Sequence, residues 1–211
     1  MIPLRGVCAL ADDAPERRWP ARRVVEGAIA GGAIAVQLRL KRTPDAQALE
    51  LARWAVGRCR FAGAALIVND RFDLADLAGA EGVHLGQDDV APEEIPAPLR
   101  ERLAIGLSTH TLEQVRQSRD RPIDYIGFGP VFGTRSKTSE YSARGLERLA
   151  EAVAAARHPV VAIGGIDAEN IDGVARAGAA AAALIGAVAD AAVPAAATRE
   201  LQRRFEAAGR A

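Results

Sequence analysis

The stretch AIAVQLRLK, residues 33–41, decides the fold that the sequence predicts. Apolar residues alternate from Ile34 to Leu40, which is the pattern of a β-strand. The opposite face begins with small residues and then turns polar, in the order Ala33, Ala35, Gln37, Arg39 and Lys41. This distribution fits a strand of a β-barrel. The alanines would line a narrow interior, and Ile34 and Val36 would face the helices. The polar end of the strand would point into the mouth of the barrel.

Eight short apolar runs alternate with longer helical patterns. Strands are expected at 7–11, 33–39, 64–68, 82–85, 103–107, 125–128, 160–163 and 181–185. Helices are expected at 17–30, 44–61, 72–78, 111–119, 146–156, 169–177 and 194–208, with a short or broken helix over the proline-containing residues 92–102. The alternation predicts an α/β protein with a single (β/α)8 TIM barrel over residues 1–211. A doubly wound open sheet competes, but both faces of its strands would be bulky and apolar.

The charges of the chain balance, with 27 Lys and Arg against 27 Asp and Glu. A balanced chain lacks the positive field that attracts nucleic acids or anionic membranes, and a 4% aromatic content argues against a base-stacking surface. Cys8 and Cys59 lack the spacing of a zinc site or a disulfide scaffold. No signal peptide or bilayer-length apolar run is evident. We therefore expect a cytoplasmic protein without nucleic-acid or membrane partners.

Charged residues follow several of the expected strands. Asp70 and Asp89 close neighbouring strands, about 5 Å apart in a sheet, and two such carboxylates can hold one Mg²⁺. Arg39, Lys41 and Lys137 are expected at the same rim, where arginine and lysine can grip phosphate. Acids and bases around one metal predict a pyrophosphate site. A plain salt-bridge network across the rim is the alternative.

Glycines mark the last two expected strands. Gly164 and Gly165 follow the seventh strand, and Gly186 takes the matching position after the eighth. In TIM barrels these two loops often bind phosphate through backbone N–H groups, although a glycine pair is more often a tight turn. Two phosphate-type sites across one mouth predict two phosphorylated substrates. The long polar loop after residues 125–128 is expected either to close over the mouth as a lid or to remain an ordinary surface loop.

The histidines are too scattered to form a zinc site. His84 alternates with apolar neighbours, so it is expected inside the barrel, either as a substrate contact or as a core histidine. His110 follows a strand and either caps the next helix or transfers a proton. The cysteines lie away from the C-terminal ends of the strands, so a thiol nucleophile is not expected.

The segments VQLRLK, VNDR, GVHLGQDD, GLSTHT, GPVFGTRSK and AIGGI resemble the thiamine phosphate synthase family in order and spacing. The resemblance covers nearly the whole chain. It implies a (β/α)8 barrel that joins a hydroxymethylpyrimidine pyrophosphate to a thiazole phosphate with Mg²⁺ and releases pyrophosphate. It implies Mg²⁺ ligands at Asp70 and Asp89.

The same resemblance implies the substrate contacts, with Arg39, Lys41 and Lys137 as the catalytic cations. The pyrimidine pyrophosphate would be held by Gln37, Arg39, Lys41, Asn69, Ser108 and Lys137. The thiazole phosphate would be held by Thr134, Arg135, Ser136, Gly165, Ile185 and Gly186. The chain departs from the usual family pattern at Leu40, Gly133, Ser136 and Gly186.

Two other functions remain open at this point. Thiazole tautomerase, a close relative that the chain also resembles, shares the barrel and would use His110 as its proton carrier, but it tends to lack the paired acids. A non-catalytic sensor of phosphorylated ligands could use the same scaffold. The expected partners are two small phosphorylated heterocycles, and a homodimer is compatible with the sequence.

Overall fold

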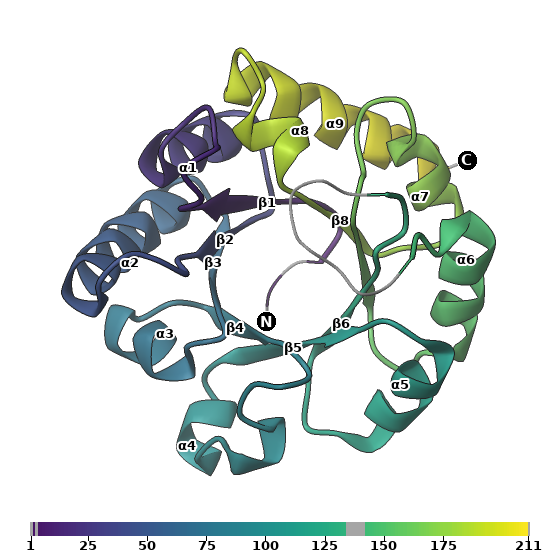
Figure 1. Ribbon diagram of the computed structural model, residues 1–211, viewed down its shortest axis with the longest axis horizontal. Coiled ribbons are helices and arrows are strands. Elements are labelled where there is room, and N and C mark those ends of the chain that lie inside the picture. Colours follow the sequence, from purple (N-terminus) through teal and green to yellow (C-terminus); the bar gives the residue numbers. More distant parts are fainter. Residues whose placement is uncertain (1, 3, 134–141, 211) are drawn as a thin grey trace.

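Eight parallel strands form a closed barrel in the computed structural model, which describes residues 2, 4–133 and 142–210 (Figure 1). The strands follow one another around the barrel in sequence order. Their bounds are β1 Gly6–Asp12, β2 Ala35–Arg39, β3 Ala65–Asn69, β4 Gly82–Leu85, β5 Ala104–Thr109, β6 Tyr125–Phe128, β7 Val160–Ile163 and β8 Ala181–Leu184. Strand β1 pairs with both β2 and β8, which closes the ring and confirms the (β/α)8 TIM barrel.

Helices cover the outside of the ring (Figure 1). Their bounds are α1 Ala21–Ala30, α2 Asp45–Phe61, α3 Phe72–Ala78, α4 Ala97–Arg100, α5 Leu112–Gln117, α6 Gly145–Ala155, α7 Ile171–Arg176, α8 Gly186–Ala189 and α9 Pro194–Ala208. Within the described residues, no helix combines the length and apolar character needed to span a membrane.

The helices differ from the sequence prediction at several bounds, including α7, which is Ile171–Arg176 rather than 169–177. The first helix begins at Ala21 rather than at residue 17, because Pro20 disfavours a helical conformation at the preceding residue. The helix expected to reach residue 119 ends at Gln117 and continues as a 3-10 turn over Ser118–Asp120. Helix α8 was not predicted at all. The prolines do break residues 92–102, into a 3-10 turn at Pro92–Glu94 and α4.

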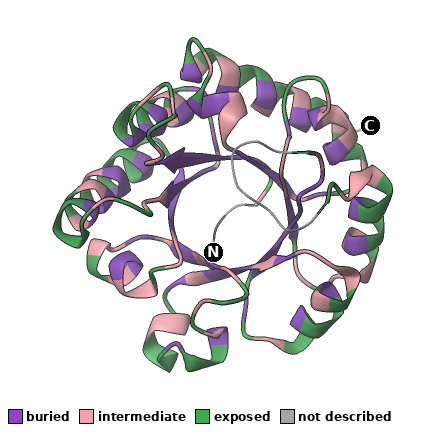
Figure 2. Cartoon of the chain, in the orientation of Figure 1, coloured by how far each residue is buried: buried purple, intermediate pink, exposed green. Residues whose placement is uncertain are grey.

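Side chains alternate between two apolar layers. Figure 2 shows that the strands and the inner faces of the helices are largely buried. In β2, Val36 and Leu38 belong to the large layer between barrel and helices, whereas Ala35 belongs to the cluster inside the barrel. The prediction was wrong for two residues before the strand, because Ala33 packs in the outer layer and Ile34 against the inner cluster. The reason is that β2 begins only at Ala35, so the alternation does not extend back to these positions.

Small residues keep the barrel interior open. Ala181 and Ala183 of β8 join Ala35 in the inner cluster, while the outer layer holds large buried side chains such as Leu38, Leu66 and Ile105. Each large apolar side chain contributes roughly 1.5–3 kcal/mol when fully buried. The outer layer therefore supplies most of the apolar stabilisation and leaves the interior available for a cavity.

The N-terminal segment and one cysteine complete the interior. Ile2 packs in the inner cluster and Leu4 packs against it. Cys8 belongs to the inner cluster, whereas Cys59 belongs to the outer layer. Burial raises the pKa of both thiols to about 12, so both stay protonated at neutral pH.

Candidate active site

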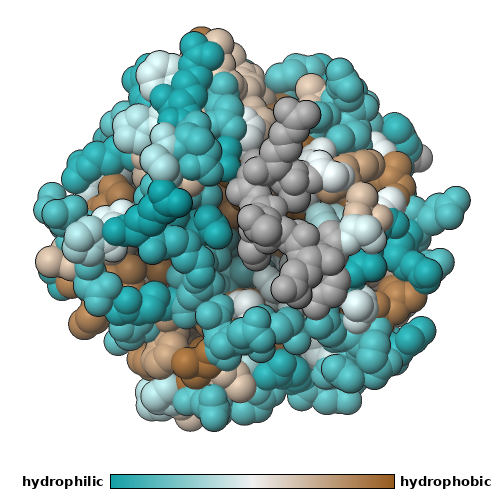
Figure 3. Space-filling model, in the orientation of Figure 1, coloured by the Kyte–Doolittle hydropathy of each residue, from teal (hydrophilic) through white to brown (hydrophobic). Residues whose placement is uncertain are grey.

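A cavity of about 370 Å³ enters the barrel between the C-terminal ends of the strands. Its floor is apolar and includes Leu4, Leu10 and Ile67, and polar groups lie closer to the mouth. Figure 3 shows a largely hydrophilic face around the hollow at the centre of the molecule. Ten candidate site residues from the sequence analysis line this cavity: Gln37, Arg39, Asn69, His84, Ser108, His110, Gly164, Gly165, Ile185 and Gly186.

Arg39 is held at the mouth by a carboxylate that the sequence analysis missed. Its Nη1 lies 3.0 Å from Oδ2 of Asp12, which ends β1 directly beside it in the strand register. The Asp12 side chain is only 1% exposed and the Arg39 side chain 19%. Asp12 stands at the C-terminal end of β1, much as Asp70 directly follows β3. This position at a strand end is the sequence signal that could have identified Asp12 as a site residue. The pair fixes one guanidinium edge and orients the rest of the group.

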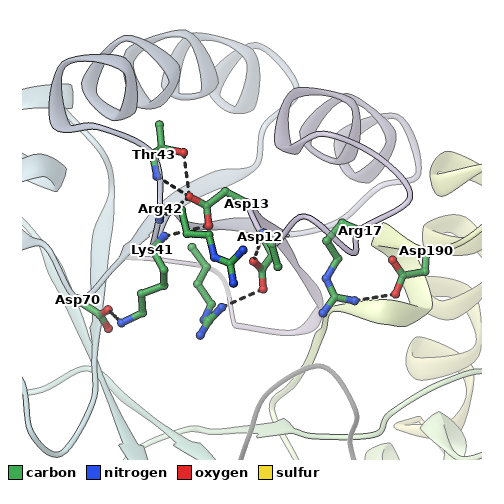
Figure 4. A network of polar contacts seen from close by, with 10 residues as sticks. Asp12, Asp13, Arg17, Lys41, Arg42, Thr43, Asp70 and Asp190 are labelled. Atoms are coloured by element: carbon green, nitrogen blue, oxygen red, sulfur yellow. Dashed lines mark hydrogen bonds and ion pairs between the residues drawn. The ribbon is translucent and has the colours of Figure 1, made fainter.

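Asp13 clamps the loop that follows β2 (Figure 4). Its carboxylate accepts hydrogen bonds from the backbone N–H groups of Lys41, Arg42 and Thr43 and from the Thr43 hydroxyl, at 2.8–3.0 Å. Burial alone would raise the pKa of Asp13, but the hydrogen bonds from Arg42, Thr43 and Lys41 outweigh burial and lower it. Asp13 therefore stays ionised and determines where the Lys41 side chain leaves the backbone.

Lys41, Asp70 and Asp89 meet at the rim beside the cavity. The Lys41 ammonium group contacts the Asp70 carboxylate, and the two side chains point toward each other in Figure 4. Burial raises the pKa of Asp70; the contact with Lys41 opposes this shift, and the neighbouring Asp89 carboxylate adds to it. Asp70 also has a positive φ of 65°, a conformation that Asp adopts more readily than most residues.

The two acids suit one hard cation. Asp89 is anchored by the backbone N–H of Gly86, which donates to its Oδ2 at 2.6 Å. A second carboxylate beside a partly buried Asp70 is repulsive unless a cation compensates it. Among the residues that the structure describes, no cluster of three or more His, Cys, Asp or Glu could hold a metal by itself. Two carboxylates with substrate phosphates and water are, however, a typical Mg²⁺ environment.

Glycines shape the opposite side of the mouth, after β7. Gly164 and Gly165 have φ values of +102° and +60°, which favour glycine. A Cβ at Gly165 would lie 2.4 Å from the carbonyl oxygen of Gly133. The Asn170 side chain donates to the Gly165 carbonyl at 2.9 Å and so holds the turn. At Gly164 and Gly165 the rim thus presents close-packed backbone, and Asp167 lines the cavity beside them.

Two histidines lie in the cavity in fixed orientations. His84 hydrogen-bonds to the Tyr125 hydroxyl through Nδ1 and to the Ser108 hydroxyl through Nε2. His110 donates from Nδ1 to the Gly129 carbonyl at 2.7 Å. The prediction that His84 points into the barrel is confirmed. Tyr125, whose hydroxyl contacts His84, was not predicted as a functional residue.

Four candidate residues fall in the segment that the structure does not describe. These are Thr134, Arg135, Ser136 and Lys137, and the expected lid lies there too. The described residues on either side are anchored to the rim, since the N–H of Val131 donates to Ile163 and the N–H of Gly145 donates to Val131, both at 2.8 Å.

The geometry suits a polar transfer reaction between two ligands. One side of the mouth offers cations and acids, the other offers glycine backbone beside Asp167, and the apolar part of the cavity lies between them. Charge that develops on a leaving phosphate would be met by preoriented cations.

Comparisons with known proteins agree with this geometry. A family model described as thiamine monophosphate synthase matches residues 7–188. Thiamine-phosphate synthase of Anaeromyxobacter dehalogenans is 48% identical over 188 residues, which cover 87% of this chain and 82% of that protein. The Moorella thermoacetica protein of the same name is 43% identical, with 87% of each chain covered.

Solved structures with a similar fold are also known. Thiamine phosphate pyrophosphorylase from Pyrococcus furiosus superposes with a TM-score of 0.87 at 32% identity, covering 98% of both chains. A 3-hexulose-6-phosphate synthase, at 18% identity and a TM-score of 0.72 over 94% of this chain and 99% of that one, shares the fold alone.

Proposed function

Because the chain belongs to the thiamine monophosphate synthase family and is therefore a transferase, we propose that its mouth joins hydroxymethylpyrimidine pyrophosphate to thiazole phosphate. The product would be thiamine phosphate, with pyrophosphate released. The observation that carries the proposal is the arrangement of Arg39, Lys41, Asp70 and Asp89 around one cavity mouth. The ion pairs of Arg39 and Lys41 support this proposal because they hold both cations near the mouth, where a phosphate could bind.

The pyrimidine pyrophosphate would occupy the side of the mouth formed by β2 to β5. The cavity-lining residues proposed to hold it are Gln37, Arg39, Asn69 and Ser108, with Lys41 at the rim. The thiazole phosphate would lie against Gly165, Ile185 and Gly186 across the mouth. Gly186 offers no hydroxyl, so it would bind this second phosphate only through its backbone N–H group.

Asp70 and Asp89 would hold Mg²⁺, which supplies charge neutralisation of the pyrophosphate when bound. Lys41 contacts Asp70 in the structure and would turn toward the diphosphate in the complex. Arg39 stays fixed by Asp12 and can donate to phosphate oxygens with its remaining N–H groups.

The reaction requires no protein nucleophile. The bond between the pyrimidine methylene carbon and the pyrophosphate oxygen breaks, and its electron pair leaves with pyrophosphate. The thiazole nitrogen then donates its lone pair to the same carbon. Arg39 and Lys41 lower the barrier because they stabilise the negative charge that develops on the leaving group.

The test is to mix the full chain with both phosphates and Mg²⁺ and to quantify thiamine phosphate by mass spectrometry. We expect turnover, and we expect Asp70→Ala to lower it at least about 100-fold through loss of charge stabilisation. Asp120→Asn, at an exposed acid, is the matched control and should be silent. His110→Gln should keep most of the coupling.

Two results would contradict the proposal. Binding of both phosphates without product would indicate a sensor. Isomerisation of a thiazole phosphate that depends on His110, without coupling, would indicate a tautomerase.

A further inference from the structure

A row of three hydrogen-bonded side chains crosses the cavity wall on three adjacent strands. The Tyr125 hydroxyl of β6 lies 3.1 Å from Nδ1 of His84 on β4. Nε2 of His84 lies 2.9 Å from Oγ of Ser108 on β5. All three side chains line the cavity, so the row ends at a hydroxyl group that a ligand can reach.

Two glycines make room for this row. A Cβ at Gly106 would lie 2.1 Å from Cζ of Tyr125, and a Cβ at Gly127 would lie 3.0 Å from Cε1 of His84. Real Cβ atoms do not approach a ring carbon as closely as the first of these distances. The Tyr125 ring therefore fits only because β5 carries glycine at position 106, and the row is a built feature of the barrel.

The chemistry of each group sets the direction of the hydrogen bonds. Tyr125 is buried, and burial holds the pKa of its phenol well above its usual value, so the phenol keeps its proton. Among the described residues, the hydrogen-bond partner of its hydroxyl is His84 Nδ1. If Nδ1 carried a proton instead, the phenolic proton would be buried without an acceptor, which is costly.

His84 is consequently the tautomer that accepts at Nδ1 and carries its proton on Nε2. The Nε2–H group donates to Ser108 Oγ, and this leaves the Ser108 hydroxyl proton to point elsewhere. Since Ser108 lines the cavity, that proton is available to a bound ligand.

We propose that Tyr125 is a positioning residue that, through His84, makes Ser108 a hydrogen-bond donor to an acceptor atom of the pyrimidine pyrophosphate. The identity of this ligand rests on the proposed function. The acceptor is a phosphoryl oxygen or an unprotonated ring nitrogen. A ligand that presents an N–H or O–H donor at this point is disfavoured, because the whole row would have to reverse.

The first test needs no activity. The chain contains three histidines, so long-range ¹H–¹⁵N spectra of the imidazoles can be assigned with His110→Gln and His158→Gln variants. We expect the Nε2–H tautomer for His84 in the ligand-free wild type. An Nδ1–H tautomer would overturn the proposal, and this result would be independent of whether the chain makes thiamine phosphate.

The second test separates positioning from support of the fold. Tyr125→Phe keeps the ring but removes the hydroxyl, and we expect a mixture of His84 tautomers and an affinity for hydroxymethylpyrimidine pyrophosphate that falls about fivefold to tenfold by calorimetry. In a Ser108→Ala background the same change should have no further effect on affinity. An equal loss in both backgrounds, or an unchanged His84 spectrum, would overturn the proposal.

Discussion

The two sides of the barrel mouth are built on opposite principles. On the β1–β2 side, Arg39 lines the cavity and is held by Asp12. Asp13 fixes the backbone that carries Lys41 at the rim (Figure 4). On the β7 side, Gly164 and Gly165 present backbone, and the neighbouring atoms leave no room for a side chain.

Because of this difference, substitutions on the two sides should impair the protein for different reasons. The charged side depends on pairing, so its variants should respond to charge and pH. The glycine side depends on shape, so its variants should respond to volume regardless of charge. Because the mouth needs both sides at once, activity should be lost in either case.

The largest effect is expected for Arg39→Ala. The substitution leaves the Asp12 carboxylate buried without its partner, which costs about 3–5 kcal/mol of unfolding free energy. It also removes a cation from the mouth and should lower kcat/KM at least about 100-fold. Urea unfolding and steady-state kinetics measure the two effects.

The double variant Asp12→Asn with Arg39→Ala separates these effects. It should regain much of the lost stability, because the asparagine side chain carries no buried charge that needs a partner. It should regain none of the activity, because the Arg39 cation is still missing. Arg157→Ala, at an exposed ion pair, is the control. If the double variant were as unstable as Arg39→Ala, the pair would not explain the stability of this side.

The next effect is expected for Gly165→Ala. Its φ of +60° strains an alanine, and the new methyl group would meet the Gly133 carbonyl at 2.4 Å. We expect a loss of about 1–3 kcal/mol in unfolding free energy, and weaker binding of thiazole phosphate by calorimetry.

Gly63→Ala is the matched control, because Gly63 has a φ of +73° but the described residues leave the space beside it open. It should cost only the backbone strain and keep full affinity. Equal effects of the two substitutions on binding would remove the argument from shape.

The smallest effect is expected for Asp13→Asn, which weakens the clamp by about 0.5–2 kcal/mol, as for other carboxylates that bind backbone N–H groups. The pKa of Asp13 is lowered in the folded state, so its contribution is fully present above about pH 4 and is lost as the pH falls through the folded value. Acid titrations of unfolding free energy should therefore show the wild type and the variant converging at low pH.

Glu93→Gln is the control for Asp13→Asn, because it removes a carboxylate of lowered pKa that lies away from the mouth. Arg121 beside it lowers the pKa of Glu93 to about 2, so the pH dependence has the same sign, while the exposed pair contributes only about 0.2–1 kcal/mol. Only Asp13→Asn should also lower activity. A loss of activity in Glu93→Gln would show that the effect is general.

The sequence allowed the barrel to be predicted because alternating strands and polar strand ends are local patterns. It did not show that the alternation stops before Ala35, because the start of a strand depends on pairing with its neighbours. Asp12, Asp13 and Tyr125 were missed as functional residues for a related reason. Their roles come from contacts with β2 and β4, which lie far along the chain. The assignment of Asp70 and Asp89 to Mg²⁺ and the homodimer remain predictions.

The two cysteines offer an experimental use of the layered core. Cys8 lies inside the ring and Cys59 between the ring and its helices, and each is almost fully shielded from solvent. A thiol-labelling reagent reaches Cys59 only when the helical layer opens. Cys8 lines the cavity and is 3% exposed, so a reagent too large to enter the cavity reaches it only when the barrel opens. Labelling rates followed by peptide mass spectrometry would therefore report, in one unmodified protein, whether the barrel and its helical coat come apart together or separately.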